Sequence, residues 1–328
     1  MNAPRATEIG GEEEVAATRR ANPYLAFATR AAIGVAVVAV LLWHYDARPV
    51  LRILARERLV FFFASIAIYV AGQVMSSWRW QLLAGVVGIR GRFREFLAYY
   101  FVGLFTNLFV PGLLGGDAAR AIYLGRKSGM LPEAVASVVA DRGTGLIALF
   151  WVAAAMALAI PSALNPGVIR VTIGAGAAAL VVFAASPMLA RWIPYMPRPL
   201  GRTMAVAYPY LRRPQTMVPA LALSAILQIS LGFCQWLIAR GLGMTAPLPL
   251  FLLCVPIANV AAGFPVTLNG LGVRETAYLV LFGMAGINRD DAIALGLLWF
   301  AATMLGGLTG AIAFAVTEFP KPTEAQGR

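Results

Sequence analysis

Long apolar runs, separated by short polar or basic segments, dominate the chain. An α-helix needs about 20 mostly apolar residues to cross the hydrocarbon core of a bilayer. The pattern therefore predicts an all-α integral membrane protein, a polytopic helical bundle with about eight transmembrane segments. The predicted apolar helices cover residues 25–43, 59–83, 96–110, 131–160, 168–190, 218–239, 247–264 and 292–316.

The domain organisation follows from where these runs begin and end. Residues 1–24 are polar and predict a flexible N-terminal tail, because the first apolar run starts too late for a signal peptide. Residues 25–317 form a single predicted transmembrane domain, and residues 318–328 form a polar C-terminal tail. The arginine-rich segment 44–58 is predicted to be either an interfacial amphipathic helix or a basic loop.

Proline and glycine interrupt the apolar pattern at two matching places. The first break spans residues 111–117, and the second spans residues 265–275. Arg120 and Arg274 follow the first proline of their break at the same distance. Backbone that leaves a helix at membrane depth must be buried in protein or line a wet cavity. We therefore predict a re-entrant or broken-helix hairpin at each break.

The two breaks divide the domain into two repeats. Repeat one covers about residues 59–160 and repeat two about residues 218–317, and each hairpin ends in a turn, near Gly129 and Gly286. If both hairpins are re-entrant, the repeats have inverted topologies. Broken helices at corresponding positions of inverted repeats indicate a transporter site, and a helix start at membrane depth favours anions.

Composition narrows the class of protein. Hydrophobic residues make up 60% of the chain and charged residues only 13%, whereas a soluble protein is about half apolar and a quarter charged. These values exclude a soluble enzyme, a nucleic-acid-binding protein and a disordered chain. His44 is the only histidine, and Cys234 and Cys254 lie inside apolar runs. We therefore expect no metal site, no disulfide and no cofactor.

The net charge of +12 is distributed unevenly. Most basic residues lie between apolar runs, on the side that also carries both termini, so we expect a multi-pass protein of the plasma (inner) membrane with cytoplasmic termini. Arg120, Arg142 and Arg274 are left at membrane depth, where a charge is either functional or paired. The alternative to substrate binding is therefore internal ion pairing, of Arg120 with Asp117 or Asp141 and of Arg274 with its neighbour.

Polar residues at and near the breaks are the candidate site. Acidic side chains there either cap a helix or bind directly, and asparagines bind either freed backbone or a head group. The adjacent Asp141 and Arg142 point to different sides of a helix, so we expect one to face the cavity. Arg79, between Trp78 and Trp80, is expected at the membrane interface. The substrate-binding candidates are Arg120, Arg274, Asp117, Asp141, Arg142, Glu275, Asn107 and Asn269, and the helix-start glycines are Gly115, Gly116, Gly270 and Gly272.

These residues also carry a resemblance. The segment 107–112, followed by Gly115-Gly116-Asp117 and Arg120, resembles the first signature of a flippase-like integral membrane family, that of the lysylphosphatidylglycerol synthase transmembrane region. Phe264-Pro265 with segment 270–275 resembles the second signature, and Asp141-Arg142 stands at the family's acidic–arginine pair. The resemblance covers about residues 60–315. It implies a domain that moves anionic or lipid-linked head groups, here without the aminoacyl transferase domain of some members.

The sequence thus predicts a lipid flippase and not an enzyme. Its substrate would be an anionic phospholipid or a lipid-linked head group of the polyprenyl-phosphate type. One alternative is a membrane enzyme acting on a lipid-linked phosphate, with Asp117, Asp141 and Glu275 holding a divalent ion. Another is a non-transporting partner subunit of a lipid or glycan pathway. The expected partners are membrane lipids, no nucleic acid, and either further copies of the chain or a pathway enzyme.

Overall fold

The computed structural model describes residues 58–109, 114–192, 208–263 and 272–317, and these residues form helices, turns and no strand. The predicted span 25–43 and the basic segment 44–58 lie outside this description, apart from Arg58. In chain order the helices are α3 (Leu59–Val86), α4 (Phe93–Phe109), α5 (Leu114–Ser128), α6 (Leu131–Ala159), α7 (Pro166–Trp192), α9 (Tyr208–Leu211), α10 (Pro214–Gly241), α11 (Leu248–Ala262), α12 (Val273–Met284), α13 (Arg289–Leu308) and α14 (Gly310–Val316).

Within these residues, five helical stretches are long and apolar enough to cross a membrane. They are α3, α6, most of α7, α10, and α13 continued by α14, and they confirm the corresponding predicted helices. The predicted runs 96–110 and 247–264 form α4 and α11, which have 17 and 15 described residues and are not among the five candidate spans. The expected count of about eight spans is therefore not confirmed within the described residues, and the predicted span 25–43 lies outside them.

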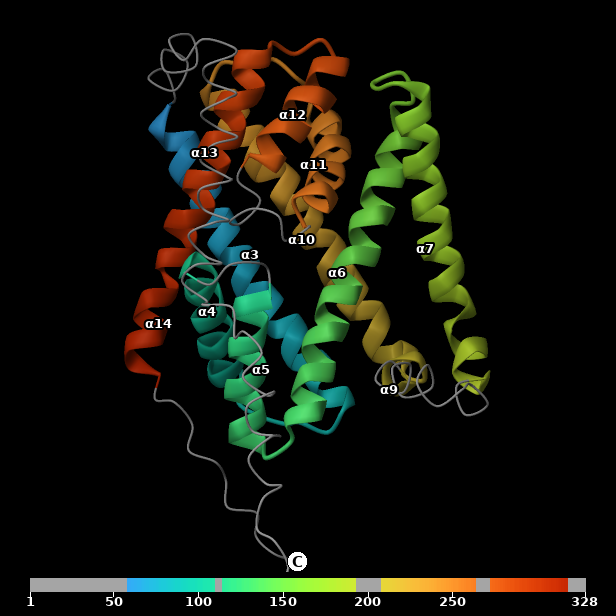
Figure 1. The fold of residues 1–328 in the computed structure, drawn as a ribbon, viewed down its shortest axis with the longest axis vertical. Helices are drawn as coiled ribbons and strands as arrows, with labels where there is room; N and C mark the ends of the chain where they lie inside the picture. The colour runs from blue at the N-terminus through green and yellow to red at the C-terminus, as the bar shows by residue number, and fades with distance from the viewer. Residues whose placement is uncertain (1–57, 110–113, 193–207, 264–271, 318–328) are drawn as a thin grey trace, which may run out of the picture.

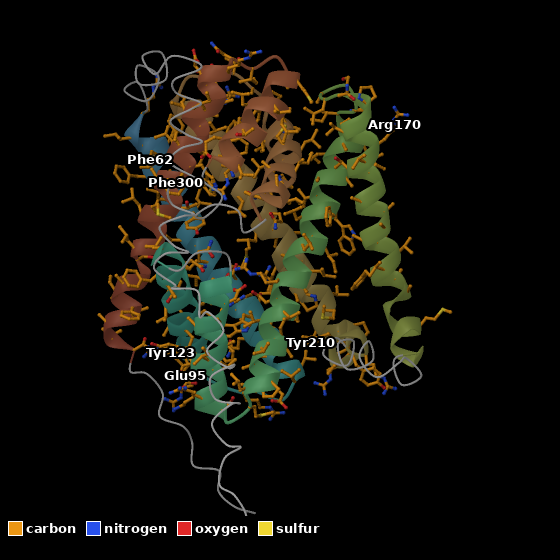
Figure 2. All side chains as sticks on the ribbon, in the orientation of Figure 1. Phe62, Glu95, Tyr123, Arg170, Tyr210 and Phe300 are labelled. Carbon is orange, nitrogen blue, oxygen red and sulfur yellow. The ribbon has the colours of Figure 1, made fainter. Side chains whose placement is uncertain are left out.

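The hairpins lie in opposite halves of the molecule. In Figure 1, α4 and α5 occupy the lower half, whereas α11 and α12 occupy the upper half. α3 and α10 run alongside each other between the halves, and α6 and α7 form an antiparallel pair at one edge. Charged side chains such as Glu95 and Arg170 lie at the two ends of the bundle (Figure 2), as expected for a protein whose middle is in lipid.

Each hairpin has its own apolar core. Trp80, Phe96 and Leu124 belong to the cluster around α4 and α5. Phe251 and Phe282 belong to a larger cluster around α11 and α12, which also takes in α10 and α13. The turns after the hairpins are made by Gly129 and Gly286, whose φ angles of 73° and 79° are in the left-handed region that favours glycine. Both predicted turns are confirmed.

Close backbone contact holds the first hairpin together. Gly103 on α4 faces Gly116 on α5, and a β-carbon on Gly103 would lie only 2.7 Å from the carbonyl oxygen of Gly116. A β-carbon on Gly116 would collide with the carbonyl of Gly103. The backbone N–H of Gly116 also donates to Oδ1 of Asn107 at 2.6 Å. Asn107 therefore binds the freed backbone of the break, one of its two predicted roles.

Candidate functional site

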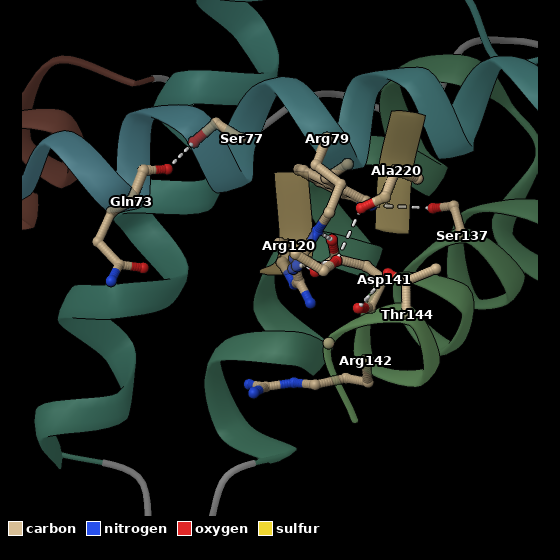
Figure 3. A network of polar contacts seen from close by, with 12 residues as sticks. Gln73, Ser77, Arg79, Arg120, Ser137, Asp141, Arg142, Thr144 and Ala220 are labelled. Atoms are coloured by element: carbon tan, nitrogen blue, oxygen red, sulfur yellow. Dashed lines mark hydrogen bonds and ion pairs between the residues drawn. The ribbon is translucent and has the colours of Figure 1, made fainter. Parts of the chain in front are cut away.

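A network of ion pairs lies where α3, α5 and α6 meet (Figure 3). Asp141 accepts at Oδ1 from Nε of Arg79 and at Oδ2 from Nη1 of Arg120, both at 2.8 Å. Asp117 accepts at Oδ1 from Nε of Arg120 at 3.1 Å, and at Oδ2 from Nε of Arg142 at 2.6 Å. The five side chains thus alternate in sign, with an arginine at each end.

Aromatic and hydroxyl groups enclose the buried part of this network. The guanidinium carbon of Arg120 lies 5.1 Å from the ring centroid of Trp80 and 4.9 Å from that of Tyr100. Trp80 is fully buried and donates through Nε1 to the hydroxyl of Ser137 at 3.0 Å. Nη1 of Arg79 donates to the hydroxyl of Ser224 on α10 at 2.7 Å. Buried charges persist when they are paired and hydrogen-bonded in this way.

A cavity of about 520 Å³ lies beside the network, between the two hairpins. Its walls come from α3, α4, α6, α10, α11 and α12, so both predicted repeats contribute. One part of the lining is apolar, with leucines 146, 149, 227 and 231 from α6 and α10. The polar lining consists of Gln73, Arg79, Tyr100, Asp141, Arg142, Gln228, Asn259 and Arg274.

Arg274 lines the cavity with donors that are not hydrogen-bonded to the described residues. It is the second residue of α12, and its Nε and Nη1 atoms are buried with no hydrogen-bond partner in the described part of the chain. Arg142 lines the same cavity, and its side chain is 50% exposed although one edge pairs with Asp117. A buried guanidinium without an acceptor is costly, so this arrangement favours an anion bound between α6 and α12.

Arg120 and Arg274 occupy matching positions in the sequence but have different surroundings in the structure. Arg120 is 3% exposed, and its pairs with Asp117 and Asp141 confirm the alternative of internal ion pairing. It is not among the described residues that line the cavity, and its part in binding a substrate stays a prediction. No ion pair within 4.0 Å joins Arg274 to Glu275 among the described residues, although the two charges interact electrostatically.

The other candidates fall into three groups. Asp141 and Arg142 both line the cavity, although only one of the two was expected there. Glu275 is fully buried and accepts from the backbone N–H of Gly272, so it caps the start of α12. Gly272 has a φ of 84°, Gly115 lies in the first turn of α5, and Gly116 makes the close contact described above. Asn269 and Gly270 lie outside the described residues.

The expectation that Arg79 and Trp80 anchor the membrane interface is wrong. Arg79 is 4% exposed and Trp80 fully buried, whereas Trp78 is 50% exposed. Sequence reasoning also missed the cavity amides of Gln73, Gln228 and Asn259. A signal was present, because Gln73, Ser77 and Trp80 on α3 recur at helical spacing, as do Ser224, Gln228 and Gln235 on α10. Polar stripes of this kind on apolar helices indicate a face turned toward the bundle interior.

The carboxylates do not form a metal-binding group. Within the described residues no three His, Cys, Asp or Glu side chains lie together. Asp117 and Asp141 direct their oxygens at arginines, and Glu275 caps a different helix. The arrangement therefore does not support the hypothesis of a divalent ion held by these three residues.

Comparison with known proteins gives a family for most of the chain. A family model described as "Lysylphosphatidylglycerol synthase TM region" matches residues 27–310. The match includes both hairpins and all the helices that line the cavity. No curated protein matches the chain.

Proposed function

We propose that this chain, which belongs to the lysylphosphatidylglycerol synthase TM region family, is a lipid flippase whose cavity carries an anionic head group between leaflets. The observation that carries the proposal concerns Arg274, whose Nε and Nη1 atoms have no hydrogen-bond partner among the described residues. Arg274 shares the cavity with the half-exposed Arg142. Phosphate oxygens match the planar fork of donors on arginine, so a phosphate group is a suitable acceptor for these side chains.

The apolar part of the cavity supports a lipid rather than a soluble anion. Leu146 and Leu149 on α6, together with Leu227 on α10, line the cavity next to the polar residues. Leu146 is 49% exposed at the surface of the described bundle. A head group held at the arginines therefore leaves its acyl or prenyl chains beside apolar side chains that face lipid.

Opposed hairpins supply a route between leaflets. α4 and α5 fill the lower half of the bundle and α11 and α12 the upper half (Figure 1), which is the arrangement that two inverted repeats would produce. In such transporters the substrate site lies between the repeats, and rocking of one repeat against the other exposes it to alternate sides. We assign the same role to the two halves of this chain, with the cavity as the site.

Reconstitution tests this function directly. The purified chain in liposomes should move phosphatidylglycerol with a fluorescent acyl chain from the inner to the outer leaflet, faster than protein-free vesicles do. The lipid recovered afterwards should have an unchanged mass, because the proposal includes no chemical step. Movement no faster than in protein-free vesicles, across a panel of anionic phospholipids and polyprenyl phosphates, would refute the proposal. A changed mass would instead support a membrane enzyme.

A further inference from the structure

We infer that Glu275 takes up a proton when Arg274 binds the anionic part of a head group, so that the chain carries a proton together with the anion. The inference rests on the proposed flippase function and adds its driving force. The observation behind it is a pair of adjacent side chains of opposite charge at the start of α12. Each holds buried polar atoms without a hydrogen-bond partner in the described part of the chain.

The carboxylate of Glu275 is fully buried in the first turn of α12. Its Oε2 accepts from the backbone N–H of Gly272, whereas its Oε1 has no partner within the described residues. A β-carbon on Gly296 of α13 would lie only 3.3 Å from Oε1, so this glycine leaves room for the oxygen and offers it no side-chain donor. A buried carboxylate oxygen without a donor is unfavourable when charged, and a proton relieves it.

The surroundings of Glu275 leave Arg274 as the charge that balances it. The helices α11 and α13 pack against α12. Besides Glu275, the titratable side chains on these three helices are Cys254, Arg274, Tyr278, Arg289, Asp290 and Asp291. The last three lie in the first turn of α13, which follows the far end of α12. Tyr278 donates its hydroxyl to the neutral amide of Gln235 on α10. The charge of Arg274 acts on both Glu275 and Tyr278.

Binding of an anion changes this balance. Without a ligand, the guanidinium of Arg274 compensates the carboxylate of Glu275. When a phosphate binds Arg274, a charged Glu275 becomes a buried anion that has lost its counter-charge, which is costly at membrane depth. Arg142 cannot replace this counter-charge, because its side chain is half exposed and pairs with Asp117. The favourable loaded state is therefore a phosphate, a guanidinium and a protonated carboxyl group.

The coupling gives lipid movement a direction. A proton from the water on one side binds Oε1 of Glu275 as the head group binds Arg274. Both leave on the other side, where the carboxylate and the guanidinium compensate each other again. No covalent bond of the lipid changes, and one negative and one positive charge cross together. A pH gradient therefore drives the anionic lipid toward the more alkaline side.

Proton uptake on binding tests the inference. Calorimetric titration of the full chain in detergent with a short-chain phosphatidylglycerol, in two buffers of different ionisation enthalpy, counts the protons taken up per lipid bound. Over a series from about pH 5 to about pH 9, the wild type should reach a maximum of about one proton. Around that maximum the lipid should bind less tightly as the pH rises, by up to about tenfold per pH unit.

Two variants show whether Glu275 is the group that takes up the proton. Glu275→Gln keeps an oxygen for the N–H of Gly272 and resembles the protonated acid, so it should bind the lipid without proton uptake. Glu133→Gln is the same change in the first turn of α6, outside the described cavity lining, and should behave like the wild type. In liposomes, an acidic outside should speed movement of labelled phosphatidylglycerol from the outer to the inner leaflet for Glu133→Gln but not for Glu275→Gln.

The outcomes separate the two claims. Phosphatidylglycerol bound without proton uptake at any pH of the series, or with the same uptake in Glu275→Gln, overturns the inference on coupling and leaves the flippase proposal intact. Failure of the wild-type chain to bind or move any lipid of the anionic panel overturns the two together. If Glu275→Gln does not fold, the proton count and the response to the pH gradient of the wild type still decide.

Discussion

At the scale of single residues, Arg120 and Arg274 stand at corresponding places after the two breaks but have different surroundings. Arg120 contacts two carboxylates and two aromatic rings. Arg274 has two buried nitrogens without a partner within the described residues and lines the cavity. The first arginine is therefore held by internal ion pairs, and we propose that the second binds the ligand.

This difference predicts that breaking the ion pairs of Arg120 destabilises the protein, whereas removing the charge of Arg274 destabilises it much less. Asp141→Asn removes the charge that lies between Arg79 and Arg120, and it leaves two buried cations facing each other. Breaking a buried ion pair on one side costs about 3–5 kcal/mol. We expect a loss of that size in the free energy of unfolding, measured by denaturant titration in detergent micelles.

Arg274→Gln provides the comparison for Asp141→Asn. It removes a charge that forms no ion pair within 4.0 Å among the described residues, so the free energy of unfolding should fall by much less than in Asp141→Asn. Denaturant titration in detergent micelles measures this free energy as well. If Arg274→Gln destabilised the protein as much as Asp141→Asn does, Arg274 would be a structural residue and its assignment to the ligand would be wrong.

Sequence reasoning found most residues of the ion-pair network but missed Arg79. Asp117, Arg120, Asp141 and Arg142 lie near the first break, and their charge at membrane depth marks them. Arg79 looks like an interface residue because it stands between two tryptophans. Its pairing with Asp141 joins α3 to α6, and no pattern within a single helix reveals which helices become neighbours.

At the scale of elements, the contact between Gly103 and Gly116 sets the spacing of α4 and α5. Gly116→Ala places a methyl group against the carbonyl of Gly103 and against the side chain of Asn107. Overpacking of this kind costs about 1–3 kcal/mol. We expect that loss in the free energy of unfolding, although alanine favours a helix more than glycine does.

The matched control for this change is Gly143→Ala on α6. A β-carbon at Gly143 meets no atom within 4 Å, so only the helix propensity changes. Alanine gains about 1 kcal/mol over glycine in a helix interior, and the stability should therefore be equal or slightly higher. Equal effects of the two substitutions would show that the glycine contact does not set the packing of the hairpin.

Helices and hairpins could be predicted where neighbouring residues in the sequence mark them. Proline and glycine at the breaks mark the hairpins, and the predicted helix 59–83 is observed as Leu59–Val86. The number of crossings was not predictable in the same way. The hairpin arm Leu248–Ala262 has 15 residues, and its apolar pattern resembles that of a spanning helix. Only its packing against α10 and α12 distinguishes this hairpin arm from a spanning helix.

At the scale of the whole molecule, the hairpins should enter from opposite sides of the membrane. Arg90 is exposed in the turn that leads into α4, and Thr245 is exposed in the turn that leads into α11. In a chain with Cys234 and Cys254 replaced by alanine, Arg90→Cys should react with an impermeant maleimide from the cytoplasmic side only. Thr245→Cys should react from the outside only, since the charge bias of the loops gives this orientation.

Labelling of both positions from one side would contradict the inverted arrangement. The cysteine-free chain is the control for unspecific reaction. Replacement of the two buried cysteines should be tolerated, and its effect is checked by comparing lipid movement with that of the wild-type chain.

The class of the molecule was readable from its sequence, whereas its cavity was not. Composition and the breaks lead to a membrane protein, and the resemblance at the breaks is confirmed by the family match over residues 27–310. The cavity requires side chains from both halves at once, such as Gln73 on α3 and Asn259 on α11. Residues so far apart in the chain come together only through tertiary packing.

The central proposal is that the guanidinium of Arg274 holds the anionic head group during transport. The most direct test compares initial rates of phosphatidylglycerol movement in liposomes for the wild type, Arg274→Gln and Arg170→Gln. Arg170 is an exposed arginine near the start of α7 (Figure 2) and is not among the residues that line the cavity. Its variant should move lipid like the wild type. Arg274→Gln should be slower by about tenfold or more, the loss expected for a charged hydrogen bond. An unchanged rate for Arg274→Gln would contradict the claim.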